Sequence, residues 1–177
     1  MSDGSTAFAR STWAGLRGKT RVRAQILQAM ALMTLTSAAQ RWVPMRRWSG
    51  VLGEPAAVPA TWGQNAGAVR SAAADGVEAD VARAIRVGSN HLPWEPSCLA
   101  QACAGQYMLH RRGTPGVVVI GLRRSNESEP ETHAWLMGRA GALTGGPAAD
   151  GFTPVTVFEQ SGGVRALDVP LMRRPST

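Results

Sequence analysis

The amino-acid sequence predicts a mixed α+β fold, because its helical patterns come first along the chain and its strand patterns come later. Upstream of Gly113, apolar residues recur at the spacing of three and four residues that is typical of helices. Downstream of Gly113, short runs rich in β-branched residues indicate strands. The chain has 177 residues, 44% of them hydrophobic and 18% charged, which suits one ordinary globular domain with a core of its own.

Three helices and four strands are expected from these patterns. The helices cover residues 20–42, 68–87 and 97–112, and Gly113 ends the last of them as a left-handed cap. The strands cover residues 116–122, 132–137, 140–144 and 154–158.

The same patterns divide the chain into three parts. Residues 1–18 are rich in Ser, Gly, Thr and Ala without clear periodicity, and we expect a flexible N-terminus there. Residues 19–63 are expected to form a helical extension and a linker that prolines and glycines interrupt. Residues 64–177 are expected to form the catalytic domain.

The first expected helix carries an apolar stripe that includes Ile26, Met30 and Met33. This stripe either packs into the core or faces outward as a docking surface for a partner. Core packing is favoured, because amphipathic helices usually bury their stripe within their own domain.

The net charge of +7 arises from 19 basic and 12 acidic residues, and Lys19 is the single lysine. Guanidinium groups pair well with carboxylates and phosphates, so the excess suits acidic peptides or nucleic acid. A high arginine content can also reflect nothing more than the base composition of the coding DNA. No basic motif interleaved with aromatic residues is present, so nucleic-acid binding is not expected.

The two cysteines do not make a disulfide framework, and the three histidines are too scattered to complete a zinc site with them. We therefore expect neither a cofactor nor a metal, and the reducing cytoplasm is the compartment that fits best. No secretory signal is visible at the N-terminus. Residues 24–40 carry no charge but contain several polar residues, so membrane association is not expected.

Cys98 is the strongest candidate for a nucleophile. It follows Pro93 and Pro96, which favour an extended approach, and it lies in the first turn of the expected helix over residues 97–112. The positive end of a helix dipole stabilises a thiolate, which is the nucleophilic form of cysteine. The unpaired backbone N–H groups of the same turn can receive a developing oxyanion.

His133 is the candidate base, since it begins an expected strand after a polar loop and can turn its imidazole toward the end of a packed helix. His91 and His110 are interpreted as surface or structural histidines. Cys103 is five residues after Cys98, or roughly 140° of helical rotation, so it is assigned to the core.

Three short stretches of the chain together resemble a known family. They are Pro96-Ser97-Cys98-Leu99-Ala100-Gln101-Ala102, the helix end Leu109-His110-Arg111-Arg112-Gly113 with the strand Val117-Val118-Val119-Ile120-Gly121, and His133-Ala134-Trp135. They are similar to the transglutaminase-like B proteins, the leader peptidases of lasso-peptide biosynthesis related to the microcin J25 processing protein. The resemblance covers residues 68–158.

This resemblance implies a papain/transglutaminase-like cysteine peptidase core with a Cys-His-Asp triad. It also implies a ribosomally made precursor peptide as substrate, a separate protein that recognises its leader, and an ATP-dependent cyclase that closes the ring after leader removal. The family often places the aspartate about a dozen residues after the histidine, where this chain reads Ala142-Leu143-Thr144-Gly145-Gly146. Asp150 is the next carboxylate and is the candidate third member, although an aspartate before glycine is often a turn former.

Two other functions use the same residues. An amide-forming transglutaminase or an amidase would form the same acyl-enzyme on Cys98 and differ in what resolves it. A catalytically silent module would keep the fold as a surface for peptide docking.

Overall fold

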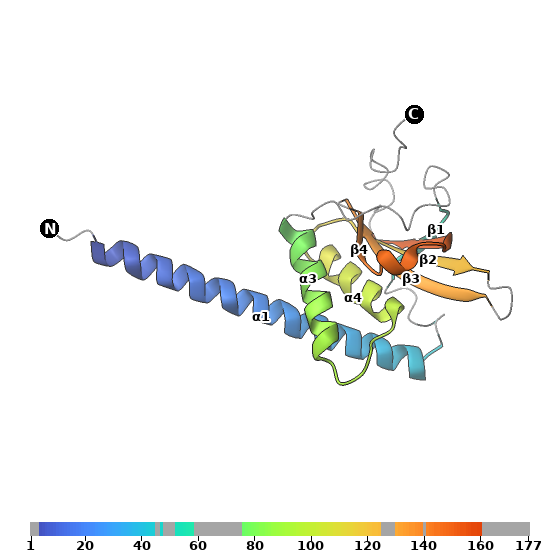
Figure 1. The fold of residues 1–177 in the computed structure, drawn as a ribbon, viewed down its shortest axis with the longest axis horizontal. Helices are drawn as coiled ribbons and strands as arrows, with labels where there is room; N and C mark the ends of the chain where they lie inside the picture. The colour runs from blue at the N-terminus through green and yellow to red at the C-terminus, as the bar shows by residue number, and fades with distance from the viewer. Residues whose placement is uncertain are drawn as a thin grey trace, which may run out of the picture.

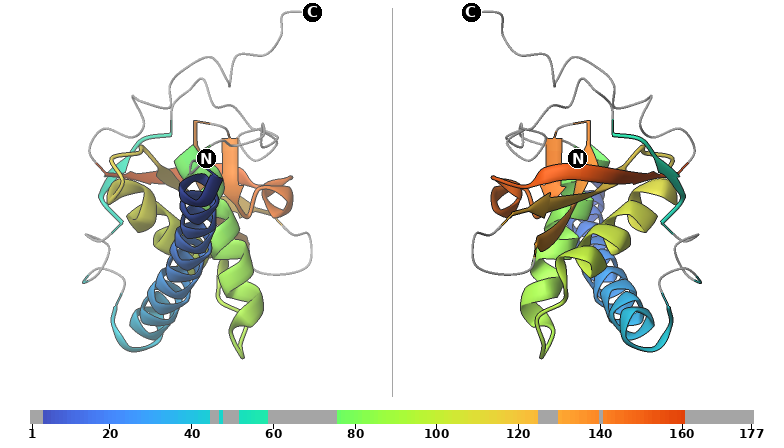
Figure 2. Two further views of the ribbon diagram at one scale, coloured as in Figure 1. Left: turned by 90° about the vertical axis from the view of Figure 1, so that its left-hand side faces the viewer. Right: turned by 90° about the vertical axis from the view of Figure 1, so that its right-hand side faces the viewer.

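The computed structural model describes residues 4–44, 47, 52–58, 76–124, 130–139 and 141–160. Helices α3 (Gly76–His91) and α4 (Cys98–His110) pack on one face of a sheet, and helix α1 (Gly4–Trp42) packs on both of them (Figures 1 and 2). The strands are β1 (Glu54–Ala56), β2 (Val117–Arg123), β3 (Glu131–Gly138), β4 (Gly141–Thr144) and β5 (Thr153–Glu159), and a 3-10 helix, η3, covers Pro147–Ala149. The predicted α+β fold is therefore confirmed, and all four predicted strands are present. Residues 68–75 of the second predicted helix and residues 125–129 of the polar loop lie outside the described residues.

The five strands form one antiparallel sheet in the order β1-β5-β2-β3-β4. Val118 in β2 is paired with Leu136 in β3 and with Phe158 in β5, and all three side chains belong to the core on the helical face. The alternating positions build a second core on the opposite face, around Trp135 and Val119. This alternation follows from the two-residue period of strands.

Helix α4 lies against the sheet, and its end is as predicted. Gly113 adopts a left-handed φ of +65°, a conformation that side chains with a Cβ rarely take. The amide of Thr114 returns to the carbonyl of Leu109 at 3.1 Å and satisfies one of the last carbonyls of the helix.

Helix α1 packs on α3 and α4 along the second half of its length. Met33 and Ala29 are fully buried, and the Met33 sulfur accepts a hydrogen bond from the Ser89 hydroxyl at 3.4 Å. Met30 and Met33 also lie against Gly88, where a Cβ would come within 3.1 Å of the Met33 methyl group. The interpretation of this apolar stripe as core is confirmed.

The N-terminal region holds two features that the sequence patterns did not predict. Helix α1 begins at Gly4, ahead of the predicted helix start at residue 20, and no proline interrupts the chain between these residues. The linker contains a strand, β1, whose backbone pairs with β5, so the sheet includes residues upstream of the predicted boundary at residue 64. Three residues with a proline at the centre carry too little pattern to predict an edge strand.

None of the helices in the described part of the chain combines the length and the hydropathy that a membrane span needs.

Candidate active site

Cys98 is the first residue of α4 and is half-buried. Ser97 caps this helix, with its hydroxyl oxygen accepting a hydrogen bond from the amide of Ala100 at 3.1 Å. The backbone of Ser97 is non-helical, with φ −58° and ψ 154°, as is usual for an N-cap residue. The Ser97 cap therefore marks where the helix begins and places the thiol at its N-terminal end.

Two backbone donors beside the thiol are free to bind another group. The amides of Ala100 and Gln101 are satisfied by the side chain and the carbonyl of Ser97, the latter at 3.0 Å. The amides of Cys98 and Leu99 form no hydrogen bond to any other residue that the structure describes. Unpaired N–H groups at a helix N-terminus are the donors that stabilise an oxyanion.

His133 lies in β3, where its Nε2 atom is 3.0 Å from the carbonyl oxygen of Gly145. A carbonyl oxygen only accepts hydrogen bonds, so Nε2 carries the hydrogen in this arrangement. The neutral imidazole then has its lone pair on Nδ1, which is the nitrogen that can accept a proton.

Two aromatic rings hold the imidazole of His133 in place. The Trp135 ring is stacked on it, with 6.0 Å between the centroids and 20° between the planes. The Phe152 ring is tilted at 41°, with a centroid separation of 5.3 Å. Phe152 is itself covered by the guanidinium group of Arg123, 4.5 Å above the centre of its ring. This packing restricts the rotation of the imidazole.

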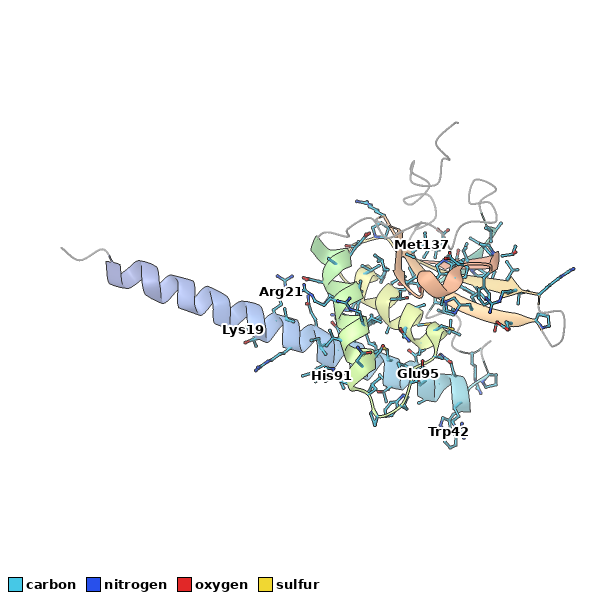
Figure 3. All side chains as sticks on the ribbon, in the orientation of Figure 1. Lys19, Arg21, Trp42, His91, Glu95 and Met137 are labelled. Carbon is cyan, nitrogen blue, oxygen red and sulfur yellow. The ribbon has the colours of Figure 1, made fainter. Side chains whose placement is uncertain are left out.

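Cys98 and His133 line one cavity of about 370 Å³. Ser97 and Gln101 from the start of α4, Thr144 and Gly145 from the end of β4, and Glu95 complete much of its wall. Figure 3 labels Glu95 in the segment that leads from α3 into α4. The fold thus brings together two of the three residues that the sequence singles out.

Asp150 is not joined to them by any hydrogen bond within the described residues. It is exposed at the end of η3, and it does not line the cavity of Cys98 and His133. The position 12 residues after His133 is Gly145, whose carbonyl accepts the bond that a carboxylate would otherwise accept. Gly145 has a φ of +67°, and a Cβ there would lie 3.0 Å from Nε2 of His133. Glycine therefore suits this position, because it adopts the left-handed conformation without strain and has no Cβ to crowd the imidazole.

The remaining cysteine and histidines lie elsewhere. Cys103 is buried in the core, as predicted, and burial raises the pKa of its thiol to about 12. His91, labelled in Figure 3, is exposed at the end of α3, where its Nδ1 atom is 2.7 Å from the Val87 carbonyl oxygen. His110 is exposed at the far end of α4 from Cys98.

The sequence analysis missed three groups that position the site: the Ser97 hydroxyl, the Gln40 side chain and the Gly145 carbonyl. The Ser97 hydroxyl donates a hydrogen bond to Oε1 of Gln40 at 2.9 Å, so α1 contacts the cap of the helix that carries Cys98. The carbonyl of Gly145 was also missed, since backbone groups leave no trace in a residue pattern. The Ser-x-x pattern before a helix could have indicated the cap, whereas nothing in the sequence indicates Gln40.

The model of the transglutaminase-like superfamily matches residues 39–157, which is more than half of the chain and includes both Cys98 and His133. The chain belongs to the transglutaminase-like superfamily. No curated protein and no solved structure matches it. Transglutaminase-like domains are typically built for cysteine chemistry, and the superfamily includes both cysteine peptidases and acyltransferases.

Proposed function

We propose that this protein is a cysteine peptidase that removes the leader from a ribosomally made lasso-peptide precursor before cyclisation. One observation carries the chemistry: the thiol of Cys98 at a helix N-terminus and the imidazole of His133, whose Nε2 is held by the Gly145 carbonyl, line one cavity. The resemblance of the stretches around Cys98 and His133 to lasso B proteins supports the substrate.

In the proposed reaction, Nδ1 of His133 takes the thiol proton as the sulfur of Cys98 attacks the carbonyl carbon of the scissile amide. The amides of Cys98 and Leu99 bind the oxyanion that forms. The imidazolium then gives its proton to the leaving amine, and the C–N bond breaks to leave a thioester on Cys98. Water, activated by the same imidazole, hydrolyses the thioester and restores the thiol.

The orienting group in this proposal is the Gly145 carbonyl rather than Asp150, because the carbonyl lies 3.0 Å from Nε2 of His133. A carbonyl selects the same tautomer as a carboxylate does. It lacks a full negative charge, so it stabilises the imidazolium less than an aspartate would. The site would then work as a Cys-His dyad.

The partners follow from the same proposal. They are the leader region of the precursor, a separate leader-recognition protein, and an ATP-dependent lasso cyclase that uses the product. The cytoplasm is the proposed compartment, since precursor synthesis and ATP are both found there.

The test incubates a lasso precursor peptide with the protein and follows the products by mass spectrometry. Cys98→Ala should abolish cleavage while the circular dichroism spectrum is retained, and His133→Ala should lower the rate by several orders of magnitude. His91→Ala and His110→Ala are the matched controls and should stay within a few-fold of wild type. Asp150→Asn should do the same, whereas a sharp loss in that variant would restore Asp150 to the site.

Other products would point to the alternative functions. If an added primary amine is incorporated in place of water, the protein is an amide-forming acyltransferase. If the precursor binds but no acyl-enzyme forms on Cys98, the protein is a silent docking module.

A further inference from the structure

A second and larger cavity, of about 640 Å³, lies beside the one that holds Cys98. Its walls come from the C-terminal half of α3, from the segment between α3 and α4, and from the end of β4. A volume of this size falls within the range of roughly 300–1,000 Å³ that is typical of ligand pockets.

The two cavities adjoin each other. Glu95, Pro96, Gln101, Thr144 and Gly145 line both of them. Arg86 and Trp94 line only the larger cavity, whereas Cys98 and His133 line only the smaller one. A chain that enters the smaller cavity can therefore continue into the larger one.

The larger cavity has an apolar wall and carries one charged side chain of each sign, Arg86 and Glu95. Ile85 is buried beneath it, Leu92 and Leu143 are half-buried, and Trp94 is 44% exposed. Arg86 is exposed and forms no ion pair with any other residue that the structure describes. Arg83, three residues earlier on the same helix, is already paired with Asp80. The guanidinium of Arg86 is thus available to a carboxylate from outside.

We propose that this groove, named here the Arg86 groove and lined by Arg86, Trp94, Leu92 and Leu143, binds an extended segment of a peptide substrate that carries an acidic side chain. An acidic side chain of the peptide pairs with Arg86, and an apolar side chain packs on Trp94. The acidic residue lies away from the scissile bond, because Arg86 does not line the cavity that holds Cys98. The inference rests on the proposed function, since it assigns the groove to the substrate of that site.

The experiment measures binding so that it does not depend on turnover. A proteome-derived peptide library is passed over immobilised Cys98→Ala, and retained peptides are identified by mass spectrometry. The same is done with Cys98→Ala/Arg86→Glu and, as a control with the same change in net charge, with Cys98→Ala/Arg83→Glu. Trp94→Ala is compared in the same background with Trp42→Ala, because Trp42 is 79% exposed and lies at the end of α1 (Figure 3).

Peptides with Asp or Glu at one position should be enriched on Cys98→Ala and on the Arg83→Glu control. Their retention should fall roughly five- to tenfold with Arg86→Glu, because an attraction becomes a repulsion. Trp94→Ala should lower retention and Trp42→Ala should not. Equal effects of Arg86→Glu and Arg83→Glu, or no acidic enrichment at all, would overturn the inference. If wild-type protein fails to cleave peptides that the groove retains, the proposed peptidase activity fails while the groove stands.

Discussion

The Ser97 hydroxyl takes part in two hydrogen bonds at the start of α4, and substitutions can separate their contributions to stability. The hydroxyl oxygen accepts from the Ala100 amide at 3.1 Å and donates to Gln40 Oε1 at 2.9 Å. The first bond caps the helix that carries Cys98, and the second ties that cap to α1. Ser97→Ala removes both bonds, whereas Gln40→Ala removes only the second.

The expected magnitudes follow from these two bonds. Loss of a serine N-cap costs about 1 kcal/mol, and loss of the hydrogen bond to Gln40 costs about 1 kcal/mol more. Ser97→Ala should therefore lower the free energy of unfolding by about 2 kcal/mol, or a Tm decrease of roughly 4–8 °C. Gln40→Ala should lower the free energy of unfolding by less than the loss of its hydrogen bond to Ser97 would by itself. The substitution also removes Nε2 of Gln40, which is buried without a hydrogen-bond partner among the described residues, and the loss of an unpaired buried group is favourable.

A double-mutant cycle measured by urea unfolding tests this reasoning. The coupling free energy between Ser97→Ala and Gln40→Ala should be about 0.5–1 kcal/mol, because the second substitution has no bond left to remove. Gln28→Ala is the matched control on α1, since its side chain accepts from Arg112 at 3.3 Å and not from Ser97. A coupling of zero, or one equal to that of the Gln28 control, would refute the link between α1 and the cap.

Two further predictions concern the core. Met33→Ala should lower the free energy of unfolding by about 2–5 kcal/mol, because the side chain is fully buried, whereas Leu35→Ala on the exposed face of α1 should change it by less than about 0.5 kcal/mol. Comparable losses in both variants, measured by thermal unfolding, would show that the exposed face is also covered. For Cys103, the thiol has a pKa of about 12 in the folded state and ionises near pH 9 when unfolded, so stability is lost as the pH rises from 9 toward 12. From pH 9 to 10 wild type should lose about 1 kcal/mol relative to Cys103→Ala, and identical pH profiles would contradict this burial.

The sequence determined the features that depend on neighbouring residues. The order of helices before strands, the strand positions and the end of α4 at Gly113 all follow from periodicity or from the conformational preference of one residue. The candidate pair was also predicted from local context, since Cys98 lies at the start of an expected helix and His133 at the start of an expected strand. The start of α1 was predicted too late along the chain, because residues 4–19 show no clear helical periodicity.

The tertiary structure alone decided how these elements meet. The bond between Ser97 and Gln40 spans 57 residues, and the bond from His133 to the Gly145 carbonyl joins β3 to the residue that follows β4, its neighbour in the sheet. A backbone carbonyl is present at every position, so no residue pattern distinguishes the one that Nε2 meets. Asp150 was a reasonable choice by sequence, because distance along the chain says nothing about which way a loop turns. The pairing of β3 with β4 brings a glycine, and not the nearest aspartate, beside the imidazole.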